Sequence, residues 1–209
     1  MISYIVATHN PAILHANLGA TLQLQDADEL VVVENAPSIA VAYNEGQARA
    51  TQPIRCYIHH DIQVLDPPAL RAQLIDWCVA PIGIVGVVGS RNRSVPWWEG
   101  AALGSVIDSR VGVQQFAKGG DAAYLDGILL ATCYELTWDE QYPGWHWYDH
   151  DICEQSIRLG RVNWCLTNGH ELVRHNNSGS FDTSQLPDWD TGRSIFTEKW
   201  GGGRAASRA

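Results

Sequence analysis

The sequence predicts an α/β fold in which a mostly parallel, Rossmann-like sheet is flanked by helices and followed by a mixed C-terminal half. In residues 1–90, short apolar runs alternate with segments that carry helix start signals. After residue 90, loops and short strand-like pieces replace this alternation. The 209 residues, 45% of them hydrophobic, suit one domain with a sizeable core. We therefore expect a single domain over residues 1–200 and a flexible basic tail over residues 201–209.

Four strands and three helices are expected in the first half. The strands are short apolar runs, at residues 2–8, 29–35, 54–60 and 82–90. Asn10 and Asp66 each precede a proline, and such a pair marks the N-cap and the first position of a helix. Pro37 is expected to open the remaining helix, which runs to about residue 50. Because strands and helices alternate at this spacing, the sheet is predicted to be parallel, with helices on both faces.

The second half predicts a less regular arrangement, divided by the aromatic loop "WDEQYPGWHWY". Its expected elements are strand-like pieces around 105–117, a strand over 124–132, a helix from Asp149 to Gly160 and a strand over 161–167. No internal repeat or linker separates the two halves. We expect the second half to cover the first.

Charge and cysteine content exclude several classes of protein. The net charge of −9 argues against a general polyanion binder, because phosphate contacts need Lys and Arg. The longest apolar run, residues 79–89, is too short to span a bilayer, and the first ten residues lack the features of a signal peptide. Five cysteines without C-x-x-C spacing indicate reduced thiols. Together these features predict a cytoplasmic protein without a transmembrane segment.

Polar side chains follow three of the predicted strands at their carboxyl ends. They are Thr8, His9 and Asn10 after the first strand, Glu34 and Asn35 after the second, and His59, His60 and Asp61 after the third. In open α/β sheets the ligand binds outside the carboxyl ends of the strands. The sequence therefore predicts a pocket at this edge of the sheet.

The segment "HHDI" at the third strand end allows two interpretations. His59 and Asp61 are two residues apart, so on a strand their side chains point the same way. An imidazole and a carboxylate on one face suit a divalent ion such as Mn²⁺, which accepts oxygen and nitrogen ligands. A hydrogen-bonded His–Asp pair that ends the strand is the alternative, and these residues alone do not separate the two.

The order of the motifs along residues 2–176 resembles that of the family 2 glycosyltransferases, which have the GT-A fold. The matching segments are "ATHNPAILHANLGATL", "VVVEN", "AYNEGQARA", "HHDI", "LDGILLA" and "WYDHDICEQSIRLGRV". "GWHWYDHDIC" followed by "RHNNSGS" is most similar to a small glycosyltransferase-like branch of that family. In this comparison "HHDI" stands in the place of an Asp-x-Asp metal motif, with His59 replacing the first Asp. Tyr148 replaces the Glu of a later acidic pair, whose Asp is Asp149.

The resemblance implies a metal-dependent transfer of a sugar from a nucleoside-diphosphate sugar, expected to be a UDP-sugar, with inversion. Asp61 and His175 are the implied metal ligands, with His59 as a third candidate. So nitrogen-rich a set favours Mn²⁺ over Mg²⁺. Asp149 is the implied general base, and the alternative is a helix N-cap.

A non-catalytic nucleotide-sugar or carbohydrate-binding module with a degenerate metal site is the competing function. Nucleotidyl transfer is disfavoured, because the sequence lacks the Gly-rich loop that grips a triphosphate.

The resemblance also assigns residues to the two substrates. Those implied at the nucleotide sugar are Thr8, Asn10, Glu34, Asn35, Arg49, His60 and Asp126. Turn and capping chemistry is the alternative for Asn10 and Asp126, and a solvated helix end is the alternative for Arg49. The aromatic candidates on the acceptor side are Trp97, Trp98, Trp145, His146 and Trp147, and one of Trp145 and Trp147 is expected to pack into the core. The acceptor stays open between a glycan, a protein and a modified nucleobase, and a homodimer is compatible with the sequence.

Overall fold

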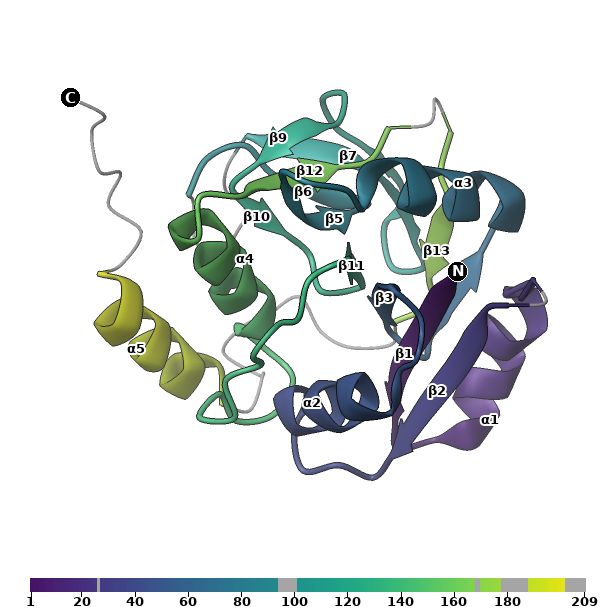
Figure 1. Cartoon of the computed structure of the whole chain (residues 1–209), viewed down its shortest axis with the longest axis horizontal. Coiled ribbons are helices and arrows are strands. Elements are labelled where there is room, and N and C mark those ends of the chain that lie inside the picture. The colour runs from purple at the N-terminus through teal and green to yellow at the C-terminus, as the bar shows by residue number, and fades with distance from the viewer. Residues whose placement is uncertain (26, 94–100, 168–169, 178–187, 202–209) are drawn as a thin grey trace.

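The computed structural model describes residues 1–25, 27–93, 101–167, 170–177 and 188–201. Its helices pack around two β-sheets (Figure 1). The helices are α1 (Pro11–Leu14), which continues as the π-helical turn η1 (His15–Gly19), α2 (Ile39–Arg49), α3 (Pro67–Trp77), α4 (Tyr148–Arg158) and α5 (Trp189–Trp200). None of the helices in the described residues is both long enough and apolar enough to cross a membrane.

The larger sheet has the strand order β2-β1-β3-β11-β5-β12-β9. Its strands are β1 (Ile2–Thr8), β2 (Glu29–Glu34), β3 (Ile54–Ile58), β5 (Ile82–Gly86), β9 (Gly120–Ala122), β11 (Leu129–Thr132) and β12 (Val162–Cys165). β1, β2, β3, β5 and β12 run in one direction, while β11 and β9 run in the opposite direction. The prediction of a mostly parallel sheet flanked by helices is confirmed.

The smaller sheet has the order β10-β6-β7-β13-β4, and β8 pairs with β7. Its strands are β4 (Ile62–Val64), β6 (Val88–Ser90), β7 (Ala102–Asp108), β8 (Gly112–Gln115), β10 (Tyr124–Leu125) and β13 (Val173–His175). The expected strands 82–90 and 124–132 are each divided between the two sheets. The first becomes β5 in the larger sheet and β6 in the smaller one, and the second becomes β10 in the smaller sheet and β11 in the larger one. The second half does not merely cover the first, since β11 inserts between β3 and β5.

Two of the expected helix starts are confirmed in atomic detail. The Asn10 side chain accepts hydrogen bonds from the backbone N–H groups of Ala12 and Ile13, and the Asp66 side chain accepts one from that of Ala69. The third start was wrong by two residues, because α2 begins at Ile39, after the N-cap Ser38, and not at Pro37. α1 and α2 flank β1 and β2 on opposite sides (Figure 1), as right-handed crossovers in opposite directions require.

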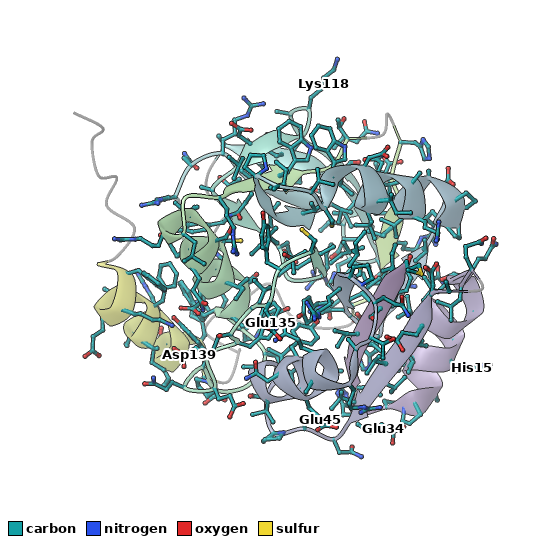
Figure 2. The ribbon with its side chains drawn as sticks, viewed as in Figure 1. His15, Glu34, Glu45, Lys118, Glu135 and Asp139 are labelled. Atoms are coloured by element: carbon teal, nitrogen blue, oxygen red, sulfur yellow. The ribbon has the colours of Figure 1, made fainter. Side chains whose placement is uncertain are left out.

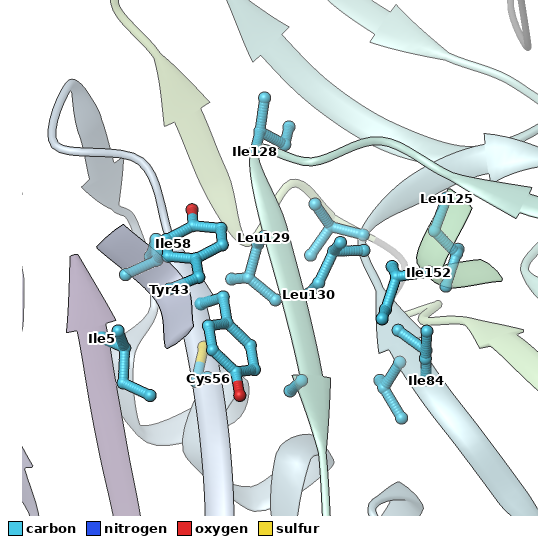
Figure 3. Close-up of a cluster of buried hydrophobic side chains, with 14 of the residues drawn as sticks. Ile5, Tyr43, Cys56, Ile58, Ile84, Leu125, Ile128, Leu129, Leu130 and Ile152 are labelled. Carbon is cyan, nitrogen blue, oxygen red and sulfur yellow. The ribbon is translucent and has the colours of Figure 1, made fainter. Parts of the chain in front are cut away.

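The hydrophobic core lies on both sides of β11. Leu129 and Leu130 of β11 are fully buried, and in Figure 3 they lie between Ile58 of β3 and Ile84 of β5. Burial of one such side chain stabilises the fold by roughly 1.5–3 kcal/mol. Charged side chains such as those of Glu45 and Lys118 lie at the periphery of the molecule (Figure 2). β11 and its neighbours β3 and β5 thus form a buried hydrophobic layer of the larger sheet.

The last described helix, α5, was not expected from the sequence. It is tied to α4 through Asp151, which is 1% exposed. The indole Nε1 of Trp200 donates to Asp151 Oδ1 over 2.7 Å, and Lys199 Nζ lies 2.9 Å from the same oxygen. The hydroxyl of Tyr142 also donates to it, over 3.1 Å. This network fixes α5 beside the start of α4, where it completes one wall of the cavity described next.

Candidate functional site

A cavity of about 530 Å³ lies where the carboxyl ends of β1, β3, β7 and β13 meet the aromatic loop and the start of α4. Its walls contain side chains from all six of these segments. The first and third predicted strand ends contribute His9 and the "HHD" segment. A cavity at the carboxyl ends of the strands is the position at which open α/β sheets bind ligands.

His59, Asp61 and His175 form a cluster in this cavity. One potential ligand atom from each lies within 4.8 Å of the others. His59 and Asp61 follow β3, while His175 ends β13, which pairs with β4 just beyond Asp61. His175 Nε2 lies 3.5 Å from Asp61 Oδ2. Since metal–ligand bonds to nitrogen and oxygen are about 2.0–2.2 Å long, one ion can contact both atoms.

The residues of this cluster strongly perturb one another. Burial lowers the pKa of His59 to about 4, so this imidazole is neutral at neutral pH. Burial tends to raise the pKa of Asp61, but the hydrogen bond from His175 and the neighbouring imidazoles outweigh it and hold that pKa well below its usual range. Burial opposes protonation of His175, yet Asp61 raises the pKa of His175 above its usual value. The cluster thus offers a carboxylate and at least one neutral imidazole, the forms that ligate metals.

Both histidines of the cluster contact a second side chain. His59 Nε2 lies 2.7 Å from the Tyr148 hydroxyl. His175 Nδ1 lies 3.4 Å from Asp108 Oδ2, because β7 and β13 are parallel and place Asp108 opposite His175. Arg110 donates to both oxygens of Asp108, over 2.9 and 2.7 Å, which fixes this carboxylate.

Asp149, the predicted base, lines the same cavity in the first turn of α4, and its side chain is 14% exposed. Asp149 Oδ1 accepts hydrogen bonds from the backbone N–H and from Nδ1 of His150, over 2.8 and 2.9 Å. Asp149 Oδ2 accepts one from the Gly127 N–H over 3.1 Å. Burial raises the pKa of Asp149, but His150 and these N–H donors lower it further, so the group is an ionised carboxylate at neutral pH.

The residues predicted at the nucleotide sugar fall into two groups. Thr8 and His60 are in contact, with 2.7 Å between Thr8 Oγ1 and His60 Nδ1, and His60 lines the cavity. Asp126 also lines it, while its Oδ1 accepts a bond from the Ile128 N–H, so the expected turn is present as well. Asn10 caps α1 beside the cavity without lining it.

Glu34, Asn35 and Arg49 lie farther from the cluster. Glu34 is exposed at the end of β2 (Figure 2), and the Asn35 N–H donates to the Thr8 carbonyl. Neither residue lines the cavity. Arg49 lies at the opposite end of α2 from the cavity-lining Ile39 and pairs with Glu45 over 3.1 Å. The structure therefore does not bring Arg49 to the cavity.

The aromatic loop forms another wall of the cavity. Trp145 is 39% exposed and its ring is 6.1 Å from that of His9. Trp147 is 3% exposed and packs 5.0 Å from Trp189, so the prediction that one of the two tryptophans enters the core is confirmed. His146 also lines the cavity. Trp97 and Trp98 lie outside the described residues.

One buried oxygen atom of the cluster, Asp61 Oδ1, indicates that the cluster fits a divalent metal ion. Asp61 Oδ1 is buried and has no hydrogen-bond partner among the described residues. A buried carboxylate oxygen without a partner is costly, and a cation is a suitable partner for it. Two imidazoles and one carboxylate suit Mn²⁺ better than Mg²⁺, which prefers oxygen ligands.

Several cavity residues were missed by the sequence analysis: Asp108, Arg110, Gly127, His150 and Trp189. Asp108 carries a signal that was available, because it is a polar residue at the carboxyl end of an apolar strand. The rule applied to the first three strands therefore applied to β7 as well. No local pattern places His150 or Trp189 at the site, since their positions depend on how α4 and α5 pack.

Comparison with known proteins supports these observations. A family model described as a glycosyltransferase-like family matches residues 17–200 of the chain. No curated protein matches the sequence significantly.

Three solved structures have a similar fold. Residues 1–349 of TarS from S. aureus superpose with a TM-score of 0.58 at 12% identity, covering 84% of this chain and 60% of that one. The mannosyltransferase PcManGT from Pyrobaculum calidifontis, in complex with GDP-Man and Mn²⁺, gives 0.56 at 14% identity, covering 88% and 59%. GalNAc-T7 with UDP, GalNAc and Mn²⁺ gives 0.51 at 10% identity, covering 85% and 44%. The chain thus spans less than two thirds of the length of each of these structures.

Proposed function

The chain belongs to the glycosyltransferase-like family and has the GT-A fold, and from this premise we propose that it transfers one sugar from a nucleoside-diphosphate sugar to an acceptor hydroxyl, with inversion. One observation carries the proposal. The His59–Asp61–His175 cluster and the carboxylate of Asp149 line the same cavity. Sugar transfer needs a site that holds the metal and the diphosphate, and it needs a base that takes the proton of the acceptor hydroxyl.

In this proposal Asp61, His175 and His59 hold a divalent ion, Mn²⁺ rather than Mg²⁺. The ion would neutralise the negative charge that develops on the departing diphosphate. The protein's part is to present three ligands from two strand ends that β-pairing already holds together. The residues therefore pay little conformational entropy when the ion binds.

Asp149 is proposed as the general base. It is ionised, because donors from His150 and Gly127 hold its pKa below the usual value despite burial. A carboxylate has about four lone-pair positions, and the described contacts use three of them. The remaining position on Oδ2 is available to accept the proton of an acceptor hydroxyl. The alternative interpretation of Asp149 as a helix N-cap is wrong, because the N-cap position of α4 is Trp147 and Asp149 lies within the first turn.

The donor nucleotide is proposed to lie beside the ends of β1 and β2, next to Thr8, Asn10, Glu34, Asn35 and His60. Asp126 is proposed to contact the donor sugar, since it lines the cavity. Arg49 has no place in this proposal because of its position at the far end of α2. We propose a UDP-sugar. The similar structures include complexes with UDP and with GDP-Man, so guanine nucleotides belong in the test.

The acceptor is proposed to approach along the wall formed by Trp145 and His146, where an exposed indole can stack on a sugar or base. Trp147 supports this wall from beneath, because it is buried against Trp189. A glycan, a protein side chain and a modified nucleobase are the acceptor classes to compare. A cytoplasmic location is part of the proposal, and it rests on five cysteines that are all free.

A screen of nucleotide sugars by thermal unfolding, each with and without Mn²⁺, tests the proposal. A true donor should raise the melting temperature by mass action, and Mn²⁺ should enhance its effect. Asp61→Ala should abolish the enhancement, and Asp149→Asn should keep donor binding while reducing turnover about 10²- to 10⁴-fold. Donor binding without turnover in the unaltered chain would instead indicate a binding module. Absence of stabilisation by every UDP- and GDP-sugar would contradict the proposed transfer from these donors and would leave a carbohydrate-binding module as the remaining function.

A further inference from the structure

We propose that Tyr148 and Asp108 are positioning residues that fix the two metal-binding histidines, and that Tyr148 thereby couples the metal to the helix carrying the base. This inference rests on the metal site of the proposed function. Metal-ligating histidines donate their outer ring N–H to a carboxylate, carbonyl or similar acceptor, which fixes the tautomer and the ring orientation. In this chain both histidines of the cluster have such a contact.

Asp108 performs this role for His175. Its Oδ2 lies 3.4 Å from His175 Nδ1, while His175 Nε2 lies on the other side of the ring, 3.5 Å from Asp61. A carboxylate only accepts hydrogen bonds, so the proton belongs on Nδ1 and the lone pair belongs on Nε2, where the metal is proposed. Arg110 holds the Asp108 carboxylate through two hydrogen bonds, so the ring is fixed by a group that cannot rotate freely.

Tyr148 fixes the tautomer and the ring orientation of His59. Its hydroxyl lies 2.7 Å from His59 Nε2, which leaves Nδ1 as the nitrogen for the metal. If the tyrosine oxygen accepts the Nε2 proton, Nδ1 carries the lone pair that ligation requires. Tyr148 is 3% exposed and packs against the rings of Tyr43 and Trp138, so its hydroxyl is held in place.

The two departures from the family pattern contact each other. His59 stands where an Asp-x-Asp motif has its first carboxylate, and Tyr148 stands where an acidic pair has its Glu. A neutral phenol beside a neutral imidazole supplies a hydrogen-bond partner without adding charge.

Tyr148 also links the metal site to Asp149. It is the first residue of α4, and the N-cap position before it, Trp147, has φ 71° and provides no side-chain cap. The first turn of α4 has two local hydrogen bonds, from the Asp151 N–H to the Trp147 carbonyl and from the His150 N–H to Asp149 Oδ1, and tertiary contacts of Tyr148 with His59 and of Asp149 with Gly127 add to them. An ion that orders His59 would order this turn, and the Asp149 carboxylate with it.

Mn²⁺ binding to the unaltered chain and three variants tests the proposal without any substrate. Free Mn²⁺ is measured by electron paramagnetic resonance during a titration with MnCl₂ alone. Tyr148→Phe and Asp108→Asn should each weaken Mn²⁺ binding about 10- to 100-fold. Tyr142→Phe is the matched control, because it removes another buried tyrosine hydroxyl that bonds α4, at Asp151, outside the cluster. It should bind Mn²⁺ like the unaltered chain.

Hydrogen exchange provides the second measurement. Mn²⁺ should slow amide exchange at residues 149–152 in the unaltered chain and in Tyr142→Phe, but not in Tyr148→Phe. Unchanged Mn²⁺ binding by Tyr148→Phe would overturn the role of Tyr148, and tighter binding would also overturn it, since it would mean that the phenol donates to His59 and blocks ligation. Tyr148→Phe keeps the ring packing, so it tests the role of the Tyr148 hydroxyl even if Asp108→Asn unfolds. Failure of the unaltered chain to bind Mn²⁺ would contradict the metal site itself, a result distinct from unchanged binding in the variants.

Discussion

His150 Nδ1 lies 2.9 Å from Asp149 Oδ1, and the backbone N–H of His150 bonds the same oxygen over 2.8 Å. One residue thus binds the candidate base twice. The His150 ring is itself enclosed by Tyr124, Trp147 and Phe196, with ring centroids 4.8–6.0 Å away. This enclosure keeps the ring directed at Asp149.

His150→Leu should raise the pKa of Asp149, because burial raises that pKa and the side-chain donor that opposes burial is lost. A carbon-13 NMR titration of the Asp149 carboxyl group measures this directly. His150→Asn should return the pKa toward that of the unaltered chain, because an amide N–H can donate in place of Nδ1. Equal values of this pKa in all three proteins would show that the backbone donors alone are responsible.

Gly127→Ala should destabilise the chain by about 1–3 kcal/mol. A Cβ at this position would overlap the hydroxyl and the ring of Tyr148, so the tyrosine must move away from His59. Urea denaturation measures the loss of stability. The variant should also lose Mn²⁺ affinity, and a variant that is destabilised yet binds Mn²⁺ normally would show that Tyr148 tolerates the displacement. Gly19→Ala, at a site away from the cavity where a Cβ meets only the Leu14 carbonyl at 3.3 Å, is the control.

Asp28→Asn should reduce the free energy of unfolding at pH 7 by about 1.5–3 kcal/mol, the usual effect of losing charged hydrogen bonds. The Asp28 side chain is 0% exposed and lies 2.7 Å from Arg71 Nε, and it accepts the Ile2 N–H over 3.0 Å. Burial opposes ionisation, but Arg71 and backbone donors lower the pKa of Asp28 below 3.8.

The effect of Asp28→Asn should therefore depend on pH. Because the folded pKa lies below the unfolded one, the stabilisation is complete above about pH 4 and is lost as the pH falls through the folded value. Denaturation at pH 7 and at pH 3 should show a smaller difference between the two proteins at pH 3. Asp76→Asn, an exposed change on the same helix as Arg71, should show no such pattern. A constant difference at both pH values would mean that Asp28 stabilises by shape rather than by charge.

Asp151→Asn should destabilise the contact between α4 and α5 by about 1–3 kcal/mol, since it weakens a buried acceptor shared by Trp200 and Lys199. Amide exchange within residues 189–200 should become faster than elsewhere in the chain, because the Asp151 carboxylate bonds both Trp200 and Lys199 of this helix. Asp190→Asn, an exposed change on α5 itself, is the control. Uniformly faster exchange throughout the chain would indicate global rather than local loosening.

The strands of the sheet were predictable where they are long and buried. β1, β2, β3 and β5 are apolar runs, so local composition specifies them. β4, β9 and β13 have three residues each and form only because a partner strand pairs with them. α5 was missed for a similar reason, because Gly192 interrupts its pattern and is required only where Trp147 packs against it. Such elements depend on tertiary contacts that no local window contains.

The same distinction applies to the site. The "HHD" segment and Asp149 were found because each directly follows or opens a predicted element. Asp108 and Tyr148 gain their importance from contacts with His175 and His59, which lie 67 and 89 positions away in the chain (175 minus 108 and 148 minus 59). Sequence alone indicated the candidate metal ligands, whereas the contacts of Asp108 and Tyr148 with them required the pairing of β7 with β13 and the packing of α4.

The position of β11 has a consequence for biosynthesis. β3 and β5 are made before residue 90, yet their common neighbour comes from residues 129–132. A nascent chain that ends before this point has two apolar strands with open hydrogen-bonding edges, which are prone to pair with other chains. Productive folding therefore waits for the second half to emerge from the ribosome. Truncated forms of this protein that stop short of residue 132 should need chaperone protection and should aggregate without it.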